Sequence, residues 1–134
     1  MKGSILGKNP VVIVSNHQGL WESFYLQTLV SPLTTIIKKE LVYVPFFGWA
    51  LNLLNPIKIN RSKKIQSAKR VIAKGSQKLD DGYSVLIFPE GTRKLPGSKP
   101  DYKTGFIGIY NHTKRKILPV AVNSGLCWPK QSWI

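Results

Sequence analysis

The chain has very few residues of the kinds that form disulfides and metal sites. Among its 134 residues there are one cysteine, Cys127, and two histidines, His17 and His112. A single cysteine cannot form a disulfide within the chain, and it is typical of a protein kept in a reducing compartment. No spacing between His17 and His112 is typical of zinc ligands, so we expect no metal site.

Acidic residues are also scarce. The chain has 6 Asp and Glu against 20 Lys and Arg, which gives a formal net charge of +14. Such an excess predicts an anionic partner, either a nucleic acid or the surface of an acidic membrane. Composition alone does not separate these two classes of partner.

No apolar run is long enough to span a membrane. The uncharged segment 41–57 is 17 residues long, whereas a spanning helix needs roughly 20 apolar residues. Pro45, Gly48 and Pro56 also interrupt it. We therefore expect a buried or interfacial helix over about 46–54 and no transmembrane helix in this chain.

What is present is an alternation of strand-like and helix-like segments, in a chain of ordinary apolar content (43%). The β-branched run 11–14 predicts a strand that is buried on both faces. Further strands are expected over 34–37, 57–60, 85–88 and 117–122. Helices are expected over 21–30, 46–54, 62–79 (with Ser62 as N-cap) and 105–110. This order predicts one α/β domain with a mostly parallel or mixed sheet flanked by helices.

A histidine and a carboxylate, His17 and Glu22, stand five positions apart directly after the first expected strand. A carboxylate bonded to one imidazole nitrogen fixes the tautomer and raises the basicity of the other nitrogen. The pair therefore predicts a general base, which contributes about 10²–10⁴ in rate. The alternatives are a purely structural His17 and a Glu22 that only complements the positive end of its helix.

No nucleophile accompanies this pair. Ser15 and Ser23 are near, but neither lies in a Gly-x-Ser-x-Gly elbow. Cys127 is a solitary cysteine, which is more often a packing residue than a nucleophile. We therefore expect direct attack by a substrate hydroxyl that His17 deprotonates.

The second segment that predicts chemistry is 88–93, Phe-Pro-Glu-Gly-Thr-Arg. Gly91 allows close approach of the backbone to a ligand, and Arg93 offers the planar fork suited to phosphate. Arg61 is a second arginine at the end of an expected strand. The alternative for each arginine is a surface residue paired with a carboxylate. Because α/β sheets bind ligands at the carboxyl ends of their strands, we expect the two segments to form one site.

These segments resemble the motifs of one enzyme family. Segment 16–22 resembles the histidine–four–acid motif of the glycerolipid acyltransferases, specifically the 1-acylglycerol-3-phosphate (lysophosphatidic acid) acyltransferases. Segments 38–49 and 59–61 resemble the second motif of that family, 88–93 the third and 117–125 the fourth. The usual aspartate is Glu22 here, a variant also associated with some bacterial members. Asn60 stands where an aspartate commonly precedes the arginine, so we assign it no role.

The resemblance implies the reaction and the residues that perform it. The donor would be acyl-CoA or acyl-carrier protein, with no other cofactor, the acceptor lysophosphatidic acid and the product phosphatidic acid. His17 would be the base and Glu22 its partner, with no covalent acyl-enzyme. The glycerol phosphate would be held by Arg61, Glu90, Gly91, Thr92 and Arg93, with Pro119 lining the acyl side. Residues 1–134 would form a single catalytic domain that lacks the family's N-terminal anchor and C-terminal portion.

The expected location is peripheral, on the cytoplasmic face of a membrane. The lysines and arginines of 62–79 would lie against anionic headgroups, each contributing about 1 kcal/mol, and the aromatic segment 43–49 would dip into the interface. The alternatives for these segments are a solvated cationic face and plain core packing. For the whole protein the alternatives are an acyltransferase for another lysolipid or an amino-acid lipid, or a module that binds nucleic acid or anionic membranes without catalysis. Nucleic-acid binding would not explain the His17–Glu22 pair, so we expect no nucleic-acid partner.

Overall fold

A computed structural model describes residues 9–128. Their centre is a five-stranded sheet in the order β3-β2-β4-β1-β5, in which every neighbouring pair is parallel. The strands are β1 (Val12–Ser15), β2 (Leu33–Lys38), β3 (Ile57–Ile59), β4 (Ser84–Ile87) and β5 (Ile117–Val120). Each lies within or close to a predicted strand, and the predicted α/β class is confirmed.

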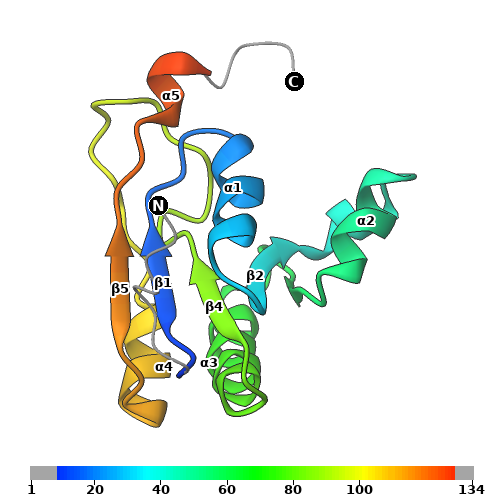
Figure 1. Ribbon diagram of the computed structural model, residues 1–134, viewed down its shortest axis with the longest axis vertical. Coiled ribbons are helices and arrows are strands. Elements are labelled where there is room, and N and C mark those ends of the chain that lie inside the picture. Colours follow the sequence, from blue (N-terminus) through cyan, green and yellow to red (C-terminus); the bar gives the residue numbers. More distant parts are fainter. Residues whose placement is uncertain (1–8, 129–134) are drawn as a thin grey trace.

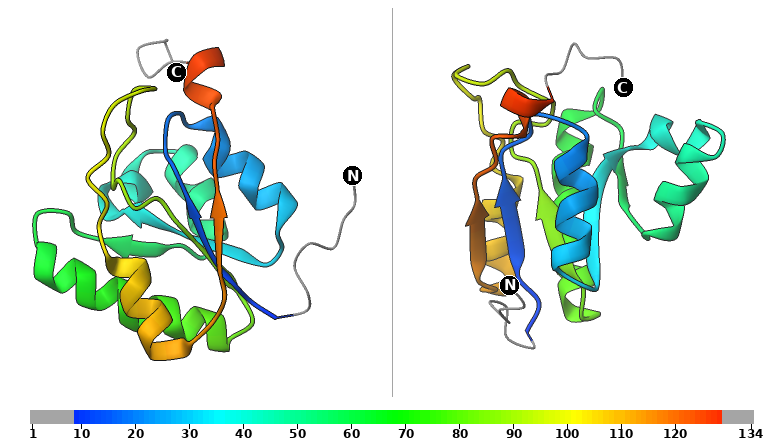
Figure 2. Two further views of the ribbon diagram at one scale, coloured as in Figure 1. Left: turned by 90° about the vertical axis from the view of Figure 1, so that its left-hand side faces the viewer. Right: turned by 45° about the horizontal axis from the view of Figure 1, so that its top comes forward.

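Helices cover both faces of this sheet. They are α1 (Trp21–Leu29), α2 (Phe47–Leu53), α3 (Lys64–Asp80), α4 (Gly105–Thr113) and the short α5 (Ser124–Cys127), with a 3₁₀ helix η1 (Lys39–Tyr43) before α2. The left view of Figure 2 shows α1 on one face and α3 with α4 on the other. In Figure 1, α2 projects away from the sheet. The 3₁₀ helix and α5 were not predicted.

The apolar residues of the strands form two hydrophobic cores, one on each face of the sheet. Val12, Val85 and Ile87 pack with Val71, Leu79 and Ile109 from α3 and α4. Ile13 and Leu86, one position along, pack with Leu26 of α1. Side chains alternate between the faces of a strand, so a strand that is buried on both sides must be apolar at consecutive positions. This is the reason for the unbroken β-branched run in β1.

The start of the longest helix differs from the prediction. Ser62 is not its N-cap: α3 begins at Lys64, and Lys63 occupies the cap position without a side-chain hydrogen bond. The hydroxyl of Ser62 donates instead to the side-chain oxygen of Asn60, 2.7 Å away, and the backbone N–H of Ser62 donates to the same atom at 3.2 Å. Asn60, to which no role was assigned, therefore shapes the turn between β3 and α3. This turn contains Arg61.

The parallel arrangement places the carboxyl ends of the strands at one edge of the sheet. His17 follows β1 by two residues, Arg61 follows β3 by two, and Phe88 directly follows β4. No helix among residues 9–128 is long and apolar enough to cross a bilayer. The fold thus gathers the candidate site residues from separate strand ends.

Candidate active site

The loop after β1 is fixed to the segment after β5. The side-chain nitrogen of Asn16 donates to the backbone carbonyl of Val122, and the backbone N–H of Val122 donates to the side-chain oxygen of Asn16. Both distances are 2.7 Å. The side-chain oxygen of Gln18 accepts the backbone N–H of Gly125 at 3.0 Å. These bonds hold the ends of β1 and β5 together, so the residue between Asn16 and Gln18, His17, has a fixed backbone.

The carboxylate of Glu22 lies under this loop, and its side chain is fully buried. Its Oε1 atom accepts the backbone N–H groups of Gln18 at 2.6 Å and Gly19 at 2.7 Å, and it lies 3.0 Å from Nδ1 of His17. Its Oε2 atom accepts the hydroxyl of Ser124 at 2.7 Å. The carboxylate therefore organises the loop as well as the imidazole.

These hydrogen bonds keep Glu22 ionised. Burial alone would raise the pKa of the Glu22 carboxyl, since it penalises the charged form. The hydrogen bonds from His17, the backbone of Gly19 and Ser124 outweigh burial and lower the pKa to about 2. Because an ionised carboxylate only accepts hydrogen bonds, Nδ1 of His17 must be the donor. In the neutral imidazole, Nε2 then keeps its lone pair and is the basic nitrogen.

The imidazole is held between Glu22 and an aromatic ring. Phe88 stacks on His17 with 4.2 Å between ring centroids and 21° between planes. The backbone N–H of His17 donates to the carboxylate of Glu90 at 3.4 Å. The backbone carbonyl of His17 accepts the N–H of Lys94 at 2.8 Å. The side chain retains 16% exposure, so it remains accessible. The structure therefore places the segment containing Glu90 directly against the histidine.

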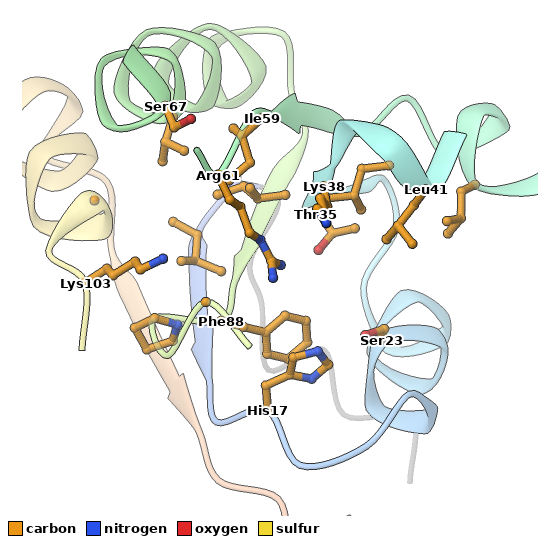
Figure 3. A pocket seen from close by; sticks show the side chains of 18 of the residues that line it. His17, Ser23, Thr35, Lys38, Leu41, Ile59, Arg61, Ser67, Phe88 and Lys103 are labelled. Atoms are coloured by element: carbon orange, nitrogen blue, oxygen red, sulfur yellow. The ribbon is translucent and has the colours of Figure 1, made fainter. Parts of the chain in front are cut away.

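A pocket of about 450 Å³ opens beside this histidine. Its apolar lining includes Leu41, Phe47, Leu51 and Leu54 from η1, α2 and the residue after α2. Its cationic lining consists of Lys38, Arg61, Lys64 and Lys103, and neither Asp nor Glu is among its described lining residues. Figure 3 shows Arg61 reaching from the end of β3 toward the space above His17 and Phe88. The pocket therefore combines a base, an anion-attracting wall and an apolar wall.

The predicted site residues divide into three groups. His17, Arg61 and Gly91 line the pocket. Glu22 and Glu90 are buried and contact His17, but they are not among the residues that line the pocket. Thr92, Arg93 and Pro119 are not among the residues that line the pocket; Pro119 is exposed in the edge strand β5, opposite Val14.

Among the residues of this site to which the sequence patterns assigned no role are Ser124 and Lys103. Ser124 contacts Glu22 from 102 positions away, and its presence in the segment that resembles the fourth family motif was the only available indication. Lys103 lies just beyond the polar stretch 94–100, whose two prolines and one glycine are typical of a surface loop, and yet it lines the pocket.

Known proteins resemble this chain in sequence and in structure. Residues 2–123 match the family model described as Acyltransferase. The chain is 44% identical over 126 residues to the 1-acyl-sn-glycerol-3-phosphate acyltransferase of Pseudomonas aeruginosa, which covers 94% of this chain and 49% of that protein. It is 33% identical over 123 residues to the protein of the same name from Saccharomyces cerevisiae, covering 89% of this chain and 40% of the yeast protein.

One solved structure is also similar. The crystal structure of the 1-acyl-sn-glycerophosphate acyltransferase of Thermotoga maritima matches with a TM-score of 0.76 and 26% identity, covering 99% of this chain and 53% of that one. The chain thus spans about half the length of the relatives it matches.

The buried charge of Glu22 predicts a specific pH dependence of stability. The carboxyl has an ordinary pKa of 4.5 and a folded-state pKa of about 2. Because the folded value is the lower one, the stabilisation is complete above about pH 4.5 and is lost as the pH falls toward 2. A shift of this size corresponds to about 3 kcal/mol. In Glu22→Gln, the free energy of unfolding measured with urea should not show this loss of stability between pH 4.5 and 2.

The exposed Glu40 provides the matched control. In Glu40→Gln, the free energy of unfolding should still fall at low pH as it does in the wild type. Parallel curves for the wild type and Glu22→Gln would mean that Glu22 is not held ionised by the fold.

Proposed function

Since the chain belongs to the acyltransferase family, we propose that it transfers an acyl group from acyl-CoA or acyl-carrier protein to the free hydroxyl of 1-acylglycerol-3-phosphate, giving phosphatidic acid. The observation that supports this best is the His17–Glu22 pair at the wall of a pocket with cationic and apolar linings. An acceptor with a phosphate and an acyl chain matches both linings. The names of the relatives support the same acceptor.

The geometry suits a single-displacement mechanism. Nε2 of His17 takes the proton from the acceptor hydroxyl, and the oxygen attacks the thioester carbonyl of the donor. The tetrahedral intermediate collapses, the carbon–sulfur bond breaks, and the imidazolium returns its proton to the leaving thiolate. Glu22 stabilises the imidazolium while it exists, because its negative charge lies 3.0 Å from Nδ1. No cofactor other than the donor takes part.

The proposal includes no covalent acyl-enzyme. Ser23 and Ser67 line the pocket, but in the described structure neither hydroxyl is hydrogen-bonded to His17, and Ser67 donates to the backbone carbonyl of Asn60. Nucleophilic serines need a base within hydrogen-bond reach. The acceptor oxygen is therefore the nucleophile.

The phosphate of the acceptor lies against the cationic wall, with Arg61 as a direct contact. Gly91 lines the pocket close to this wall, and Glu90 holds the backbone of His17 beside it. Thr92, Arg93 and Pro119 join the proposal on the strength of the family motifs, with Thr92 and Arg93 near the phosphate and Pro119 on the acyl side. The acyl chain occupies the apolar wall formed by η1 and α2.

The protein acts at a membrane surface. Tyr43, Phe46, Trp49 and Leu53 are 81%, 79%, 63% and 87% exposed, so these residues of 43–53 are not packed in the core. Phe47, by contrast, is partly buried and lines the pocket. Exposed aromatic and leucine side chains in a protein that also has a strongly basic helix, here α3, are typical of peripheral proteins on anionic bilayers. We place the protein on the cytoplasmic face, with the pocket near the lipids that supply and receive its substrates.

The role of the imidazole is tested by His17→Ala. We expect kcat for acyl transfer to lysophosphatidic acid to fall about 10²–10⁴-fold, because the described lining of the pocket contains no second histidine and no carboxylate. The loss of one donor to Glu22 should lower the unfolding midpoint, but the chain should still fold. His112→Ala changes the other histidine, which is exposed at the end of α4, and should keep full activity. Full activity in His17→Ala would remove the histidine from the mechanism.

The phosphate contact is tested by Arg61→Ala. We expect KM for the phosphate-bearing acceptor to rise about tenfold or more, since a hydrogen bond to a charged group contributes roughly 1.5–3 kcal/mol, with little change in KM for the donor. Arg115→Ala, which removes only a surface ion pair with Asp80 at 3.6 Å, is the control. An equal rise for acceptor and donor would argue against a direct phosphate contact.

Membrane binding is tested with the double variant Phe46→Ser/Trp49→Ser. Removing two exposed aromatic rings should weaken partitioning onto vesicles that contain anionic lipid by about tenfold or more, because each buried ring contributes roughly 1.5–3 kcal/mol. Tyr110→Ser, at an exposed position on α4, should bind as the wild type does. Equal binding by all three proteins would show that α2 does not meet the bilayer.

A further inference from the structure

We propose that Lys103 is a phosphate-binding residue of the acceptor site, placed across the pocket from Arg61. The inference rests on the proposed function, because it assigns a substrate contact within the same pocket. It concerns a residue outside all of the segments in which the sequence predicted a role. The position of the ammonium group, its surroundings and the charge of the pocket each support it.

The backbone of Lys103 is fixed against the turn that follows β4. Its N–H donates to the carbonyl of Pro89 at 2.8 Å, and the N–H of Gly91 closes the turn onto the carbonyl of Phe88 at 3.0 Å. Tyr102, Lys103 and Thr104 all line the pocket, so this stretch forms one of its walls. A lysine whose backbone is pinned at a pocket wall has far fewer places for its ammonium than one in a free loop.

The side chain of Lys103 lies over Gly91. A Cβ atom at Gly91 would be 2.5 Å from Nζ, 3.0 Å from Cε and 3.3 Å from Cδ of Lys103. The lysine therefore occupies the space that the absent side chain leaves. Gly91 also has a φ of +69°, which other residues rarely adopt. Glycine at this position thus permits both the turn and the close approach of the ammonium.

The ammonium group has no carboxylate partner within residues 9–128. The ion pairs in this part of the chain are His17–Glu22 and Arg115–Asp80, and the described lining of the pocket is free of Asp and Glu. Figure 3 shows Lys103 extending into the pocket from one wall while Arg61 enters from another. A phosphate monoester has about −1.5 to −2 charges near pH 7. Two cations from separate walls match that charge better than Arg61 alone.

The two cations offer different contacts. Arginine binds phosphate through a planar fork of donors, whereas lysine is a compact point charge with three rotatable donors. Arg61 would therefore set the orientation of the phosphate, and Lys103 would add charge from the side of Gly91. The donor acyl-CoA also has phosphate groups, so the same chemistry has two sources. The proposal commits to the acceptor, because Gly91, beneath Lys103, belongs to the turn that packs against His17.

The test is equilibrium binding by the full chain in mixed micelles. The ligands are 1-acylglycerol-3-phosphate, 1-acylglycerol without phosphate, and acyl-CoA. Lys103→Ala should raise Kd for the phosphate-bearing acceptor about tenfold or more and leave Kd for 1-acylglycerol and acyl-CoA unchanged. Lys103→Arg should recover most of the affinity. Lys99→Ala, exposed nearby in the same loop and outside the pocket lining, is the matched control and should bind like the wild type.

A second pair of variants uses the contact with Gly91. The added methyl of Gly91→Ala displaces the ammonium, so this change should weaken phosphate-acceptor binding. In a Lys103→Ala background the same substitution should have a smaller effect, since coupled neighbours are not additive. Strictly additive effects would show that Gly91→Ala does not act through the ammonium of Lys103, which would contradict the proposed contact.

Other outcomes overturn the proposal directly. Equal losses for the phosphate-bearing and the phosphate-free acceptor would make Lys103 structural, and a loss confined to acyl-CoA would assign it to the donor. Turnover is measured separately on the wild type. Wild-type acyl transfer with no change of Kd in Lys103→Ala leaves the proposed function standing without this residue. Absence of transfer together with the expected change of Kd would leave the phosphate site and remove the activity.

Discussion

The buried negative charge of Glu22 is the interaction on which the rest of the site depends. A buried carboxylate without partners would cost several kcal/mol, so the fold must supply donors to it. They come from the backbone at Gln18 and Gly19, from the imidazole of His17 and from the hydroxyl of Ser124. Satisfying one charge therefore fixes the loop after β1, the tautomer of the histidine and the position of α5.

The parallel sheet supplies the remaining geometry. Because all of the strands run in the same direction, β1, β2, β3 and β4 end at one edge and deliver His17, Lys38, Arg61 and Phe88 to one pocket. No two of these residues are neighbours in the sequence. The described lining of the pocket lacks carboxylates, and the acids near the histidine, Glu22 and Glu90, are buried behind it. The negative charges thus lie outside the pocket lining, and the positive charges face the pocket.

Much of this arrangement was predictable because its determinants are local. The β-branched and apolar runs predicted the strands, and His17 and Glu22 are only five positions apart, so the turn between strand and helix brings them together. The bond from Ser124 to Glu22 joins residues 102 positions apart, and no local pattern indicates it. The same holds for Lys103, whose place over Gly91 depends on how a long loop returns to the sheet.

Two differences between the sequence pattern and the structure have equally physical causes. Ser62 has a side chain suited to an N-cap, but its hydroxyl donates to the side chain of Asn60 instead, and the helix begins at Lys64. Arg61 and Arg93 were treated alike because both follow strands. The left-handed φ at Gly91 changes the direction of the chain before Arg93, and only Arg61 lines the pocket. Spacing from a strand does not determine direction once a glycine of this kind intervenes.

The second helix connects two environments through a single backbone. Phe47 and Leu51 line the pocket, while Trp49 and Leu53 on the same helix are turned outward and exposed. Gly48 packs so tightly that a Cβ atom would lie 2.3 Å from the carbonyl oxygen of Val42, so the backbones of η1 and α2 are in close contact. Because α2 is one short helix, its inner and outer faces move together. Any tilt imposed on its outer face is transmitted as a change in the depth of the cavity within.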